Sequence, residues 1–180
     1  MNDFEKTEEW PDAAPARMTE LYDAVECLKE GHRELKRELR ELEERAIEAA
    51  HAFAEGELQR LRELRPATRR FLLRLQSHRD WEEEVLHPFL RRYFNLDNKP
   101  TLLPSFWKLE KEYELAVSSM HAFTNMLDDL YDSADWTEIR QTTYQLIRSC
   151  HLIGKYFQAE ERFVHPLAEQ ALTDIDYFYS

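Results

Sequence analysis

Apolar residues recur along most of this chain at alternating steps of three and four positions, which is the spacing of one face of an α-helix. The first such stripe predicts a helix from about Ala16 to Ala52. Its one polar position is His32, and the other faces are dense in Glu, Lys and Arg, as a solvated surface would be. The stripe consists of Met18, Leu21, Val25, Leu28, His32, Leu35, Leu39, Leu42, Ala46 and Ala49.

A second stripe predicts a helix that follows a turn around Gly56 and ends near Tyr93. His78 and Glu82 lie one turn apart on this stripe, so both side chains should face the core. Because proline is well tolerated in a first helical turn, an alternative is a short extra helix followed by a helix that begins at Pro66. The stripe consists of Leu61, Leu64, Thr68, Phe71, Leu75, His78, Glu82, Val85 and Phe89.

Two further stripes predict a third and a fourth helix. The third follows a loop over residues 95–104, with Ser105 as its expected cap, and consists of Phe106, Leu109, Tyr113, Ala116, Met120, Phe123, Leu127 and Leu130. The fourth follows a turn over residues 132–135 and consists of Ile139, Thr142, Leu146, Ser149, Ile153, Tyr156, Glu160, Phe163 and Leu167. These elements predict an all-α, antiparallel up-down-up-down four-helix bundle over residues 16–170, with a lead-in over 1–15 and a tail over 171–180.

Composition supports a helical fold and limits the expected partners. The 180 residues include three glycines, 43% hydrophobic and 33% charged residues, which is typical of an all-helical protein. The net charge of −12 argues against nucleic acid or an anionic membrane surface as a partner. No stretch has the apolar length of a membrane span, and the acidic start is unlike a signal peptide. With Cys27 and Cys150 far apart in sequence, we expect a cytoplasmic protein with reduced thiols.

An internal repeat and a count of residues from each turn place the His, Glu and Tyr positions of the four stripes at one level. Residues 82–90 match residues 160–168 at an offset of 78, so that His78 corresponds to Tyr156. In a helical hairpin, residues equally distant from the turn lie side by side. The midpoint between positions 32 and 78 is 55 and that between 113 and 156 is 134.5, both inside predicted turns. We therefore expect one layer that contains His32, His78, Glu82, Tyr113, Tyr156 and Glu160.

Such a layer indicates a metal or cofactor site, because an unpaired His or Glu is costly to bury in a helical core. The pattern resembles the haemerythrin-like (HHE cation-binding) domains, which carry His, His-x3-Glu, His and His-x3-Glu or His-x4-Asp on successive helices around a non-haem diiron centre. Four residues match those ligand positions, whereas both second-half histidines are tyrosine here. The matching residues are His32, His78, Glu82 and Glu160, and the tyrosines are Tyr113 and Tyr156.

The resemblance implies a protein that binds or senses O2 or NO, or that handles iron and oxidative stress. Three chemistries are open at the site: phenolate ligation of ferric iron, a two-histidine, one-carboxylate set for a single iron, and a metal-free hydrogen-bonded core. Two other functions are therefore open as well. One is a non-haem iron oxidative enzyme that acts on a small molecule, and the other is a metal-free bundle that acts through its surface or as a homodimer.

Several other residues carry weaker signals. His121 and His151 lie off the stripes and are expected to be partly exposed. His87 and His165, each four residues after a glutamate, are expected to point about half a turn away from the layer and to form local hydrogen bonds at the helix surface. The aromatic residues expected to pack the core are Trp81, Trp107, Trp136, Phe106 and Phe123.

Overall fold

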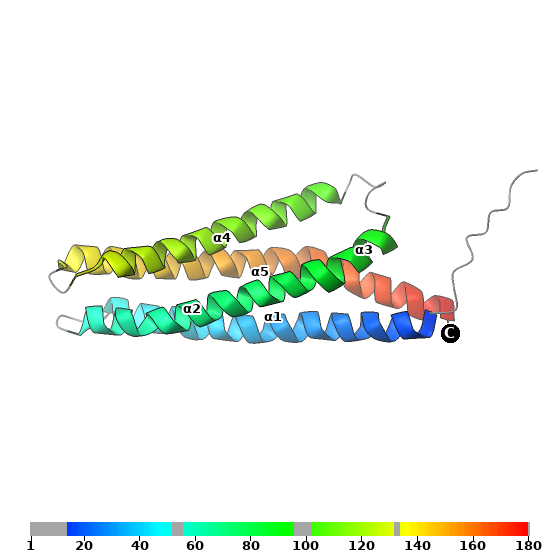
Figure 1. Cartoon of the computed structure of the whole chain (residues 1–180), viewed down its shortest axis with the longest axis horizontal. Coiled ribbons are helices and arrows are strands. Elements are labelled where there is room, and N and C mark those ends of the chain that lie inside the picture. The colour runs from blue at the N-terminus through cyan, green and yellow to red at the C-terminus, as the bar shows by residue number, and fades with distance from the viewer. Residues whose placement is uncertain (1–13, 52–55, 96–101, 132–133, 180) are drawn as a thin grey trace, which may run out of the picture.

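The computed structural model describes residues 14–51, 56–95, 102–131 and 134–179, and within these ranges the chain is helical apart from short connections (Figure 1). The described ranges contain no strand, which confirms the predicted all-α class. None of their helices is long and apolar enough to cross a membrane. The elements are α1 (Ala14–His51), α2 (Glu57–Trp81), the π-helical segment η1 (Glu82–Leu86), α3 (His87–Tyr93), α4 (Leu103–Asp129) and α5 (Trp136–Tyr179).

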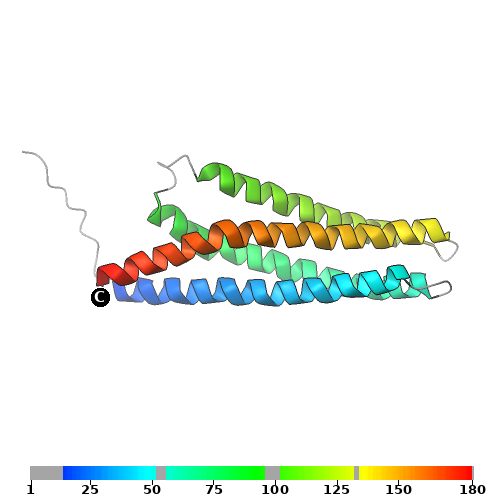
Figure 2. The ribbon, with the colours of Figure 1, turned by 180° about the vertical axis from the view of Figure 1, so that it is seen from behind.

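The long helices lie side by side along a common axis (Figures 1 and 2). Helix α1 packs against both α2 and α5, and α4 packs mainly against α5. The C-terminal end of α1 and the start of α5 lie at one end of the molecule, and the start of α1 and the end of α5 lie at the other (Figure 1). Ion pairs join neighbouring helices, among them Lys29 with Glu169 at 2.9 Å and Arg65 with Asp128.

The helix boundaries correct two sequence predictions. Helix α2 begins at Glu57 and runs unbroken through Pro66, so the alternative with an extra short helix is wrong. Helix α4 begins at Leu103, with Pro104 in its first turn, so Ser105 lies inside the helix and does not cap it. Of the expected loop over 95–104, residues 96–101 lie outside the described ranges, as do residues 132–133 of the last turn and residues 1–13 of the lead-in.

The start of α5 is stabilised by a reciprocal pair of hydrogen bonds. The Glu138 backbone N–H donates to Asp135 Oδ1 at 2.9 Å, and the Asp135 N–H donates to Glu138 Oε2 at 2.9 Å. This capping box satisfies two backbone donors that a helix start leaves without partners. At its other end α5 continues to Tyr179, so residues 171–179 are helical; there Tyr93 of α3 donates to Asp174 at 3.0 Å.

Buried apolar side chains form two clusters along the long axis, and a polar layer separates them. On α1 the first cluster begins at Leu35 and the second ends at Leu28, with His32 between them. Glu82 and Glu160 lie at the same boundary on the second and fourth predicted stripes. All three side chains are buried, with exposed fractions of 1%, 0% and 0%. The fold therefore places one imidazole and two carboxylates in a buried layer inside an otherwise apolar core.

The π-helical segment shifts the buried face of the second stripe by one residue. His87 N–H donates to the Glu82 carbonyl, which is the i to i+5 bond of a π-turn. Leu86, the last residue of this segment, and Leu90 are fully buried, whereas the predicted Val85 is 46% exposed. Pro88 explains the shift, since its ring cannot donate and would clash with the carbonyl four residues earlier in an α-helix. The predicted core positions Val85 and Phe89 are therefore wrong by one residue.

Helix α5 shows the same shift after Glu160, ahead of Pro166. Val164 and Ala168 are fully buried there, whereas the predicted Phe163 and Leu167 are half-buried. The two halves of the internal repeat thus behave alike: each carries a glutamate in the polar layer, a change of buried face and then a His-Pro pair.

The aromatic predictions are confirmed in part. Phe123 is fully buried, and Trp81 and Phe106 are half-buried and pack against the second cluster. Trp107 and Trp136 are 63% and 55% exposed, so their assignment to the core is wrong. Trp136 is the first residue of α5, where its ring lies 4.5 Å from the Arg140 guanidinium and forms a cation–π contact at the surface.

Candidate metal centre

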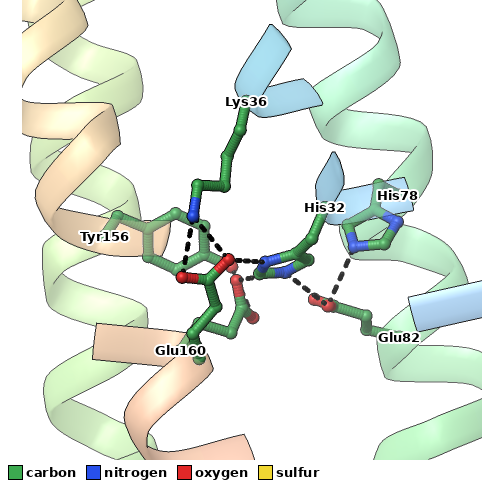
Figure 3. A network of polar contacts seen from close by, with 7 residues as sticks. His32, Lys36, His78, Glu82, Tyr156 and Glu160 are labelled. Atoms are coloured by element: carbon green, nitrogen blue, oxygen red, sulfur yellow. Dashed lines mark hydrogen bonds and ion pairs between the residues drawn. The ribbon is translucent and has the colours of Figure 1, made fainter. Parts of the chain in front are cut away.

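Four donor side chains of the predicted layer lie close together between α1, α2, η1 and α5 (Figure 3). His78 Nε2 lies 3.1 Å from Glu82 Oε1. His32 Nε2 lies 3.2 Å from Glu160 Oε2 and 3.8 Å from Glu82 Oε1, so this nitrogen faces both carboxylates. The two imidazole rings have centroids 5.2 Å apart. The level expected from the residue count is thus observed for both histidines and both glutamates.

The two tyrosines occupy the same level but differ in where their hydroxyls point. Tyr156 is 2% exposed, and its hydroxyl donates to Glu160 Oε1 at 2.8 Å. The ring of Tyr113 lies beside it, with centroids 5.4 Å apart, but the Tyr113 hydroxyl donates to Gln76 Oε1 at 2.8 Å. The structure therefore brings five of the six predicted side chains together, and it directs the oxygen of Tyr113 towards the side chain of an exposed residue of α2.

Buried polar atoms without hydrogen-bond partners are concentrated in this layer. Among the described residues, they include both ring nitrogens of His32, Nε2 of His78, both carboxylate oxygens of Glu82 and Oε2 of Glu160. Several of these atoms face one another at ion-pair distance, but burying so many polar atoms without hydrogen bonds is costly, and native proteins rarely do it unless an ion or ordered water satisfies them. Ligand atoms of His32, His78 and Glu82 all lie within 4.8 Å of one another, so one cation can reach all three. The donor set fits a metal ion.

The charges of the layer are strongly coupled. Burial by itself lowers the pKa of His32, but the carboxylates of Glu160 and Glu82 outweigh it and raise that pKa to about 9. Burial and the charge of Glu82 raise the pKa of Glu160 to about 7. The pKa of Glu82 moves the other way, since His32 and His78 overcome the effect of burial and lower it. Without metal, a protonated His32 therefore balances an ionised Glu82 at neutral pH.

The pKa of the Tyr156 phenol lies well above its usual value of 10, because the group is buried and faces the carboxylates of Glu160 and Glu82. In the metal-free protein Tyr156 is therefore a hydrogen-bond donor that fixes one oxygen of Glu160. This leaves the second oxygen, Oε2, directed at His32. Tyr156 orients a carboxylate of the layer, whatever role its oxygen takes when a cation is bound.

Two side chains of α5 that we did not predict as site residues lie against His32. Glu161 Oε1 is 3.6 Å from His32 Nδ1, and Lys36 Nζ donates to both Glu161 oxygens at 2.8 and 2.9 Å. The His165 ring packs edge-on against His32, with centroids 4.6 Å apart, and its Nε2 is buried without a hydrogen-bond partner. Burial and the charge of His32 lower the pKa of His165 to about 4. The expectation that His165 forms local hydrogen bonds at the surface is wrong.

The structure also tests the predictions made for His87, His121 and His151. His87 packs edge-on against Phe106 with centroids 5.5 Å apart, and its Nε2 is buried and unpartnered, so its expected surface hydrogen bond is also wrong. Burial lowers its pKa. His121 and His151 are exposed, which agrees with their position off the stripes. Glu161 directly follows Glu160 and lies about 100° around α5, and it faces α1 because α5 packs against α1.

An open hollow of about 330 Å3 lies over His32 between α1 and α5. It lies on the side of the layer where Glu161 and Lys36 are paired. Its lining is rich in basic side chains and consists of Lys29, His32, Arg33, Lys36, Arg40, Glu161 and His165.

We expect Glu161→Gln to weaken binding of a divalent metal about 10- to 100-fold, the usual effect of removing the carboxylate behind a ligating histidine. The reason is that Glu161 faces Nδ1 of His32 and favours the ring orientation in which Nε2 faces Glu82 and Glu160. Competition titration with Co2+ at fixed pH measures the change. Glu169→Gln is the matched control, because Glu169 pairs with Lys29 on the same two helices and should leave affinity unchanged. Equal affinities for wild type and Glu161→Gln would contradict this role.

No family model matches the sequence, and no curated protein and no solved structure matches the chain.

Proposed function

We propose that this chain is a haemerythrin-like, antiparallel four-helix bundle that binds one or two non-haem iron ions in its polar layer. The observation that carries the proposal is the set of buried donor atoms of His32, His78 and Glu82, which make no hydrogen bond and lie within 4.8 Å of one another. Two histidines and one carboxylate with open positions are the donor set typical of non-haem Fe(II). Glu160 adds a second carboxylate, which is the type of ligand that spans two ions.

Each residue of the layer has a separate task in this proposal. His32 and His78 provide nitrogen donors, and Glu82 and Glu160 neutralise the charge of the cation. Tyr156 holds Glu160 through a 2.8 Å hydrogen bond, and Glu161 lies behind His32. The apolar clusters on both sides of the layer limit access of water, and we infer that a small molecule would reach the layer through the hollow over His32.

If His32, His78 and Glu82 hold iron, the metal would keep coordination positions open for a diatomic ligand. The proposed function is therefore binding or sensing of O2 or NO, or handling of iron and oxidative stress, in the cytoplasm. A second candidate is an oxidative enzyme, and the position of the Tyr156 phenol against Glu160 favours it. Turnover of an organic substrate distinguishes the enzyme from a protein that only binds diatomic ligands.

Metal analysis combined with a visible absorption spectrum tests the proposal. The protein is expressed in iron-rich medium, and a second sample is stripped and reloaded anaerobically with Fe2+. We expect one or two iron ions per chain in the wild type and loss of that iron in His78→Ala, because one of the two nitrogen donors is removed. His121→Ala is the control, since His121 is exposed and contributes no donor to the layer.

The spectrum separates the open alternatives. A purple phenolate-to-iron band that disappears in Tyr156→Phe would make Tyr156 a ligand and favour the enzyme. Absence of iron in both wild-type samples, with the helical circular dichroism intact, would leave a metal-free bundle and reject the proposal.

A further inference from the structure

We propose that Gly31 is a positioning residue for His78: the absence of a side chain at position 31 provides the space in which the imidazole lies beside the metal layer. The effect of Gly31 on metal binding rests on the proposed function, whereas the placement of the His78 ring by Gly31 does not. A Cβ atom at Gly31 would lie 2.5 Å from Cε1 and 2.6 Å from Nδ1 of His78. Carbon atoms do not approach this closely, so a side chain at position 31 must displace the ring.

The backbone does not require glycine at this position. Gly31 lies within the unbroken helix α1, and no glycine in the described ranges has a positive φ. In a helix interior, glycine is less favourable than alanine because more backbone freedom is lost on folding. A reason for glycine must therefore come from packing, and the contact with His78 is the close approach that supplies it.

The space at Gly31 affects where the donor nitrogen of His78 lies. With its ring against Gly31, His78 directs Nε2 at Glu82 Oε1 at 3.1 Å, and the same ring stacks on Trp81 with centroids 5.8 Å apart. The next residue on α1 is His32. Helix α1 therefore contributes one nitrogen donor at position 32 and the space for the second at position 31.

The other two glycines of the chain make no such contact. A Cβ at Gly154 of α5 would meet only Leu39 Cδ2 at 4.0 Å, which is an ordinary van der Waals distance, and one at Gly56 would meet nothing within 4 Å. Gly31 and Gly154 are both half-buried and both lie inside long helices. Gly154→Ala is therefore a matched control for Gly31→Ala.

The first experiment measures affinity for Co2+ by competition with a chelator. We expect Gly31→Ala to weaken Co2+ binding about 10- to 100-fold, the range found when support of a ligating histidine is lost. Gly154→Ala should bind Co2+ like the wild type. Unchanged affinity in Gly31→Ala, or an equal loss in both alanine variants, would overturn the metal-positioning role.

The second experiment needs no metal and uses urea unfolding in the presence of a chelator. In the His78→Ala background the ring is gone, so Gly31→Ala should raise the urea midpoint as much as Gly154→Ala does. In the background that retains His78, Gly31→Ala should raise the midpoint less or lower it, because the ring must move. Equal effects in both backgrounds would refute the contact. A wild type that binds no Co2+ but shows this coupling would reject the proposed function and keep the placement of His78 by Gly31.

Discussion

Replacing three buried ionisable residues of the polar layer together, as His32→Leu, Glu82→Met and Glu160→Met, is expected to abolish metal binding and to make the metal-free protein more stable. All three residues are at most 1% exposed, and most of their polar atoms make no hydrogen bond although they lie within ion-pair distance of one another. Apolar replacement of a buried charged cluster by residues of similar volume is neutral or stabilises by about 1–4 kcal/mol. Methionine fits here because its flexible side chain fills irregular space.

Two measurements check this triple variant. Urea unfolding in a chelator should give a higher free energy of unfolding than that of the wild type, and a Co2+ titration should show no binding. Glu160→Ala alone should have the opposite effect on stability and cost about 3–5 kcal/mol, because it leaves His32 and Tyr156 without their buried partner. A triple variant that is less stable than the wild type would mean that the polar layer stabilises the fold even without metal.

The stability of the metal-free protein is expected to fall as pH rises from 5 to 9. The folded-state pKa of His32 is about 9, above its ordinary 6.5, so its stabilising contribution is complete below about pH 6.5 and is lost as pH rises through 9. The folded-state pKa of Glu160 is about 7, above its ordinary 4.5, so the stabilising contribution of Glu160 is lost as pH rises through 7. Glu82 has a lowered pKa, so its contribution is lost only in acid, below about pH 4.5. Above pH 5 the first two effects act in the same direction.

Metal affinity should show the opposite dependence on pH. A ligating imidazole and carboxylate must release their protons, so apparent Co2+ affinity should rise about tenfold per pH unit for each proton released. The two trends are measured on the same samples, by urea unfolding in a chelator and by Co2+ titration between pH 6 and 9. His32→Gln should flatten the stability trend, and His121→Gln should leave it as in the wild type. Stability that does not change across this range would contradict a protonated His32 in the metal-free layer.

The sequence by itself determined which helix faces are buried and at what level the polar positions lie. His32, Glu82 and Glu160 are buried as their stripes predict, and His32 and His78 meet as the residue count requires. These features are predictable because the 3.6-residue period and the equal spacing about a hairpin turn depend on the chain alone. The bundle topology, the haemerythrin-like family and the iron ligands inferred from the same pattern remain proposals.

Only the tertiary structure decided which neighbour each side chain meets. Tyr113 lies on its stripe, yet its hydroxyl reaches Gln76 on the adjacent helix. Glu161 and His165 lie off their stripe, yet they contact His32, because α5 packs against α1 as well as α4 and so buries more than one narrow face. Pro88 and Pro166 shift the buried face of helices in which the 3.6-residue period otherwise predicts that face. Gly31 matters because the His78 ring of another helix packs against it. Such contacts depend on how closely helices approach and how they are rotated, which residue spacing does not encode.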